Sequence, residues 1–106
     1  MAKSSAKAKE KVEVGNPNTG RRMQIDADTW NLFSRAIKHS LKGGKALTYT
    51  EMVEEIDDYF KKNKIKFTQS VGWYAVTVKH DLHVKKIIEV FTEKGKKLHR
   101  LAKGNS

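Results

Sequence analysis

Apolar side chains recur at helical spacing in the first half of this 106-residue chain. Trp30, Phe33, Ile37 and Leu41 follow one another at intervals of three, four and four residues, which places them on one helical face. The spacing predicts a helix over residues 27–41.

Capping residues mark both ends of this helix. Asp26 or Asp28 can cap its N-terminus, where a carboxylate also suits the helix dipole. Gly43 and Gly44 follow its last turn, where a left-handed residue ends many helices.

A second helix is expected from Thr48 to about residues 61–63. Thr48 and Glu51 have the three-residue spacing of a capping box. The apolar positions of this helix are Met52, Val53, Ile56, Tyr59 and Phe60. The acidic positions on its opposite face are Glu51, Glu54, Glu55 and Asp58.

The segment from Ser70 to Lys86 is rich in β-branched residues, and residues 71–79 also fit a strand. Its length favours a helix, as does the recurrence of Tyr74, Val78 and Leu82 every four residues. Thr68 or Ser70 then caps its start.

Shorter apolar runs predict strands. Residues 87–91 and 97–102 read as two strands joined by a turn at Gly95, and residues 46–48 as a small strand between the first two helices. The order helix, strand, helix, helix, strand, turn, strand indicates an α+β fold. It is that of a mainly helical winged helix-turn-helix with three helices and a small β-ribbon wing.

The expected domain spans residues 15–103. Residues 1–14 carry little to bury and read as a flexible basic tail, in which Val12 and Val14 fit a short edge strand. Residues 15–22 are dense in turn formers.

The net charge of +10 is unevenly distributed. Residues 1–22 carry +4, residues 23–60 carry −3 and residues 61–106 carry +9. Such asymmetry points to a polyanionic partner, and the plain alternative is a solvated basic surface.

Composition narrows the function classes. The chain has no cysteine, which excludes disulfides and thiol chemistry. No apolar run is long enough for a membrane helix, and the N-terminus lacks the apolar segment of a secretory signal. Motifs of hydrolases, nucleotide-binding loops and dinucleotide folds are missing. We therefore expect a cytoplasmic binding protein, not an enzyme, with no cofactor and no membrane partner.

Two segments carry a resemblance. NPNTGRR from Asn16, together with SVGWYAVTVKHDL from Ser70, resembles an uncharacterised family of small bacterial proteins. The resemblance covers residues 14–102 and implies a winged-helix-like domain of unknown function. The run from Thr77 to Phe91 is also similar to the helix-to-wing passage of bacterial regulators, although Lys85 and Lys86 stand where those often have glycine.

A winged helix would place the third helix in the major groove of double-stranded DNA, its probable partner on this interpretation. The expected contacts are Ser70, Trp73, Thr77, Lys79, His80 and His83 on the helix, Lys94, Lys96 and Lys97 on the wing, and Arg21 and Arg22 on an N-terminal arm.

Each of these residues also has a structural interpretation. Trp73 is expected more often to pack in the core or against the NPNTGR turn than to stack on a base. Arg21 and Arg22 fit equally well as partners of the acidic face of the second helix. His80 and His83 share the spacing of metal ligands but lack a near third ligand, so no metal is expected.

The acidic second helix favours a rival function. A carboxylate face is repelled by DNA, so it must point away, or the domain docks on a protein instead. Single-stranded RNA is less favoured because an aromatic platform is missing. We expect a monomer or a weak homodimer.

Overall fold

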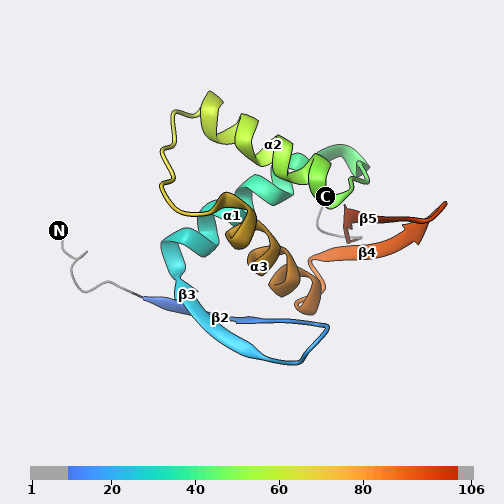
Figure 1. Cartoon of the computed structure of the whole chain (residues 1–106), viewed down its shortest axis with the longest axis horizontal. Coiled ribbons are helices and arrows are strands. Elements are labelled where there is room, and N and C mark those ends of the chain that lie inside the picture. The colour runs from blue at the N-terminus through green and yellow to red at the C-terminus, as the bar shows by residue number, and fades with distance from the viewer. Residues whose placement is uncertain (1–9, 103–106) are drawn as a thin grey trace.

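The structure is a computed structural model that describes residues 10–102 (Figure 1). Within this range it is an α+β fold of three α-helices and two small antiparallel hairpins. The strands are β2 (Lys11–Gly15), β3 (Arg22–Asp26), β4 (Ile88–Glu93) and β5 (Lys96–Leu101), and the helices are α1 (Ala27–Ser40), η1 (Lys42–Gly44, 3-10), α2 (Tyr49–Lys62) and α3 (Val71–Val84). The predicted class and the three predicted helices are confirmed.

The face of α1 predicted from its spacing is the buried one. Phe33, Ile37 and Leu41 have no exposed surface. The predicted side-chain cap is wrong, however. Asp26 occupies the N-cap position but makes no capping hydrogen bond, and its carboxylate pairs with Lys11 at 2.7 Å instead.

The other two helices begin at the predicted caps. The Thr48 hydroxyl accepts the N–H of Glu51, and the Glu51 carboxylate accepts the N–H of Thr48, which completes the capping box. Ser70 Oγ accepts the N–H of Trp73 at 3.0 Å and starts α3. The segment after Ser70 is therefore helical, and the strand interpretation of residues 71–79 is wrong.

Aromatic rings fill the centre of the core. Phe33 of α1 meets Phe60 of α2 at a centroid distance of 5.3 Å and Phe67 of the following linker at 4.9 Å, both edge to face. The Phe33 ring lies 5.8 Å from that of Tyr74 on α3. Edge-to-face pairs add to the burial energy of each ring, so this cluster joins the three helices.

The short strand predicted at residues 46–48 is a single β-bridge. Leu47 donates its N–H to the carbonyl of His99 at 2.9 Å, and His99 returns the bond at 2.8 Å. The bridge attaches the segment between α1 and α2 to the inner edge of the β4–β5 hairpin.

The β2–β3 hairpin revises the expected N-terminal boundary. Residues 11–14 belong to β2, which pairs with β3 in the register Val12 to Ile25 and Val14 to Met23. The short strand expected at Val12 and Val14 is therefore present, and residues 11–14 are not part of a tail, because Val14 and Ile25 are buried against the helices. The rest of the expected tail, residues 1–9, and residue 103 lie outside the described residues.

Helix α3 lies in the middle of the molecule (Figure 1). It contacts α1 and α2 on one side, β2 on another, and β4 at its C-terminal end. The two hairpins therefore flank the helix that is expected to be the binding element.

Candidate nucleic-acid interface

The outer face of α3 is formed by Trp73, Thr77, His80 and Val84, at intervals of four, three and four residues. Trp73 and Val84 are each 45% exposed, whereas Thr77 and His80 are half-buried. Trp73 is therefore not buried in the core as favoured above. Its ring rests edge-on against that of its neighbour Tyr74, at 4.8 Å.

Lys79 does not lie on this outer face. Only 6% of its surface is exposed, which corrects the expectation that it reaches bases as an exposed side chain. Burial, together with the charge of Lys97, lowers the pKa of Lys79 to about 8. Among the described residues no hydrogen bond or ion pair of its ammonium group is found.

Lys79 is part of a basic cluster that comprises Lys79, His80, His83, Lys97 and His99. Burial, together with the charges of Lys79 and Lys97, lowers the pKa of His80 to about 4. Burial and the same two lysines also lower the pKa values of His83 and His99. The charged neighbours behind these shifts are all basic. Because the lowered pKa values leave the histidines mostly neutral at pH 7, the positive charge of the cluster comes from Lys79 and Lys97.

His99 was not among the expected site residues. It is fully buried, and its Nδ1–H donates a hydrogen bond to the carbonyl of Leu47 at 2.9 Å. The other ring nitrogen, Nε2, has no hydrogen-bond partner among the described residues. The alternation of β5 is the signal that places it there, because His99 and Leu101 share the inward face of that strand.

The same alternation divides the three wing lysines. Lys97 shares the inward face with His99, toward α3, whereas Lys96 lies on the opposite face of the ribbon. Lys94 and Gly95 form the two-residue turn, both with positive φ (54° and 79°), as a type I′ hairpin turn requires. Of the three, Lys97 therefore joins the basic cluster.

Arg21 and Arg22 lie on the first hairpin, not on a free arm. In the preceding turn the Asn16 side chain accepts the N–H groups of Asn18 and Thr19, as predicted for an ordered turn. Arg22 pairs with Glu13 across the hairpin at 3.5 Å and not with the acidic face of α2, which was one of two equal alternatives. Arg21 makes no ion pair with any described residue.

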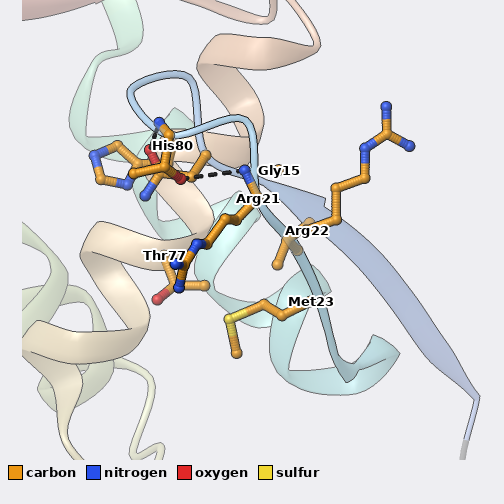
Figure 2. A pocket seen from close by; sticks show the side chains of 9 residues that line it. Gly15, Arg21, Arg22, Met23, Thr77 and His80 are labelled. Carbon is orange, nitrogen blue, oxygen red and sulfur yellow. Dashed lines mark hydrogen bonds between the residues drawn. The ribbon is translucent and has the colours of Figure 1, made fainter.

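The hairpin and α3 enclose a cleft of about 670 Å³ (Figure 2). Arg21, Arg22 and Met23 line it from the hairpin, and Thr77 and His80 line it from α3. In Figure 2 the Arg21 side chain runs toward Thr77, while that of Arg22 points away from the helix. Four of the residues proposed from the sequence for DNA contact are thus brought together.

Asp81 joins the hairpin to the helices. Its carboxylate is 1% exposed and accepts hydrogen bonds from the backbone N–H of Gly15 at 3.0 Å, from Trp30 Nε1 at 2.8 Å and from Lys85 Nζ at 2.6 Å. Lys85 Nζ also lies 5.0 Å from the centre of a Trp30 ring. Sequence reasoning missed this residue because a lone aspartate in a helix is usually solvated.

The acidic side chains of α2 lie away from this interface. Glu51, Glu54 and Asp58 are exposed, while Met52 and Ile56 on the other face are fully buried in the core. These carboxylates therefore lie on the solvent-facing side of α2, opposite the side that packs in the core.

The described part of the chain has neither a metal-binding cluster nor a membrane-spanning helix. No group of three His, Cys, Asp or Glu side chains is placed to share a metal ion. None of the helices has the length and apolarity needed to cross a membrane.

A family model described as a family of unknown function, DUF6958, matches residues 11–98. The chain belongs to this family. The match begins at β2, includes the first hairpin, all three helices and β4, and ends within β5, so the family unit contains the cleft and most of the basic cluster. Neither the curated proteins nor the solved structures contain a match.

The buried histidines predict a loss of stability in mild acid. The pKa values of these histidines are lower in the folded protein than in the unfolded chain. Below about pH 6.5 the unfolded chain therefore binds more protons than the folded protein. The free energy of unfolding therefore falls as the pH falls from about 7 to about 5, because the unfolded chain takes up protons at these histidines first. Urea unfolding at both pH values measures the loss. A His80→Gln/His83→Gln variant should lose less, and an unchanged loss would contradict this origin.

Proposed function

We propose that this protein is a winged-helix module that binds double-stranded DNA, with α3 and its two flanking hairpins against the duplex. The observation that carries the proposal is the basic cluster between α3 and β5, in which the charge of Lys97 lowers the pKa of the buried Lys79 and neither lysine forms an ion pair with a described residue. Phosphate groups are the partner that such a positive charge favours.

The topology supports the winged-helix part of the proposal. The order α1, bridge at Leu47, α2, α3, β4, β5 is that of a winged helix, and the bridge to His99 supplies the third strand of its small sheet. In such a fold α3 is the recognition helix and the β4–β5 hairpin is the wing.

The composition of the α3 face determines the kind of binding. Its outer positions carry Trp73, Thr77 and His80, and no arginine, lysine, asparagine or glutamine, the side chains that read bases best in pairs of hydrogen bonds. His80 is neutral at physiological pH because its pKa is lowered to about 4. We therefore propose binding that is dominated by phosphate contacts, with a weak sequence preference.

The wing lysines provide the test. Lys94, Lys96 and Lys97 are replaced together by alanine, and Lys61, Lys62 and Lys64 form the control triple. The control lysines are equally exposed and lie at the far end of α2 from the wing (Figure 1). Fluorescence anisotropy with a mixed-sequence duplex at several salt concentrations gives the affinity and its salt dependence.

The wing triple should weaken binding about tenfold or more and reduce the salt slope by roughly 2–3, while the control triple changes affinity less than about threefold. Equal effects of the two triples would mean that only net charge matters. Absence of binding even at low salt would overturn the proposal altogether.

A protein partner is the second candidate, favoured by the exposed apolar residues Trp73 and Val84 on one face of α3. On this alternative Trp73→Ala abolishes capture of the partner, and the wing triple has no effect on it. A monomer without DNA affinity and without any captured partner would exclude both candidates.

A further inference from the structure

The cleft between the β2–β3 hairpin and α3 has the size and polarity of a small-molecule site. Its volume of about 670 Å³ falls within the range of about 300–1,000 Å³ typical of ligand pockets. One wall is strand and turn, and the other is the Thr77 and His80 turn of α3. Asp81 holds the two walls together through the N–H of Gly15.

The cleft carries a positive charge, and one of its two arginines is free to pair with a ligand. No aspartate or glutamate lines it, and both arginines do. Arg22 is engaged by Glu13 and directed outward, whereas Arg21 lies along the cleft toward Thr77 without an ion-pair partner among the described residues (Figure 2). A guanidinium presents a planar fork of donors that matches a carboxylate or a phosphate.

Besides the arginines, the cleft offers two polar side chains and one apolar side chain, a combination that favours an organic anion over an inorganic ion. The Thr77 hydroxyl can donate to an anionic oxygen, and the neutral His80 ring offers one donor and one acceptor. Met23 is 44% exposed and extends into the opening, where it presents an adaptable apolar surface.

We propose that this cleft binds a small organic anion, a carboxylate or phosphate monoester, whose charged group pairs with Arg21 beside Thr77 and whose apolar body rests on Met23. This site shares Arg21, Thr77 and His80 with the face proposed for DNA, but it needs neither the wing nor Lys79. Because one wall is α3, an occupied cleft also restricts the face that α3 offers to any macromolecule.

Backbone-amide NMR titration of the full chain tests the site with phenyl phosphate, benzoate, inorganic phosphate and benzyl alcohol. Saturable shifts confined to Gly15–Met23 and Thr77–Asp81 are expected, with a Kd of roughly 0.1–1 mM for the better organic anion. Phenyl phosphate against benzoate identifies the charged group. Benzyl alcohol lacks the charged group and inorganic phosphate lacks the apolar body, so each should bind at least about tenfold more weakly.

Arg21→Gln is the test variant and Arg22→Gln its matched control, since both remove one charge from the same hairpin. Arg21→Gln should weaken binding about tenfold or more, and Arg22→Gln less than about twofold. Arg21→Lys, which keeps the charge but loses the fork, should fall between them and covers the case in which the glutamine variant misfolds.

Three results would overturn the proposal. Equal effects of the two glutamine variants would indicate net charge alone, as would shifts spread over the wing lysines. Shifts that never saturate would show that the cleft does not hold a ligand. The DNA-binding proposal is tested separately, because its duplex titration uses the wing triple and not Arg21→Gln.

Discussion

Replacing Asp81 with alanine is expected to lower the free energy of unfolding by about 3–4 kcal/mol. Asp81 is 1% exposed and accepts from Gly15, Trp30 and Lys85. Alanine leaves the two N–H donors of Gly15 and Trp30 without an acceptor, and each unsatisfied buried donor costs about 1–3 kcal/mol. Lys85 is half-exposed and regains water, so it contributes little to the loss.

The matched control is Glu89→Ala. Glu89 also pairs with a cation, Arg100 at 2.8 Å, but both side chains are nearly half-exposed, so its loss should cost less than about 1 kcal/mol. Urea unfolding gives both values. Amide exchange of Gly15 should accelerate in Asp81→Ala more than exchange in α2, because the hairpin detaches before the core opens. Equal losses in the two variants would show that the buried network adds nothing beyond a surface ion pair.

Replacing Lys79 with methionine is expected to do the opposite and stabilise the protein by about 1–3 kcal/mol at neutral pH. Lys79 is charged there although it is buried and has only cations as charged neighbours, which is why its pKa is lowered from 10.5 to about 8. Each pKa unit corresponds to about 1.4 kcal/mol against the charged form. Methionine keeps the volume and the apolar contacts of the side chain without the charge.

The pH dependence identifies the cause. A lysine with a lowered folded pKa destabilises the protein fully below about pH 8, and this cost disappears as the pH rises toward 10.5, where the lysine is neutral in both states. The advantage of Lys79→Met should therefore shrink between about pH 7 and about pH 10. Lys62→Met, on the exposed end of α2, should change stability by less than about 0.5 kcal/mol at either pH.

The same variant bears on function. If the basic cluster contacts phosphate, Lys79→Met weakens DNA binding about three- to tenfold while raising stability. A buried charge that costs stability and supports binding is typical of a functional site. Higher stability with unchanged DNA affinity would mean that Lys79 is not part of the interface, and the wing and Arg21 would have to carry it.

Local patterns in the sequence were sufficient for the helices and the C-terminal ribbon. The spacing of Phe33, Ile37 and Leu41 predicted the buried face of α1, and Thr48 with Glu51 predicted the start of α2. Gly95 predicted the turn between β4 and β5, because that turn needs positive φ. Such features depend on residues a few positions apart, so they can be predicted without knowledge of the tertiary structure.

The β2–β3 hairpin could not be predicted in the same way. A six-residue turn separates its strands, and only Val14 and Ile25 are buried, so the alternation is weak. Its position against α3 depends on Asp81, a contact that spans 66 residues. The two segments that carried the family resemblance are thus joined by a bond that neither segment reveals alone.

Only part of the candidate site could be predicted from the sequence. The chain by itself determined the excess of basic residues, the neutral face of α3 and the turn that displays Arg21, because these follow from composition and local conformation. Only the tertiary structure decided that Lys79 is buried, that Lys97 and not Lys96 turns toward α3, and that Arg21 and His80 share one cleft. The physical reason is that the exposure and the potential of a charge depend on what packs around it, and here β5 and the first hairpin reach α3 from opposite ends of the chain.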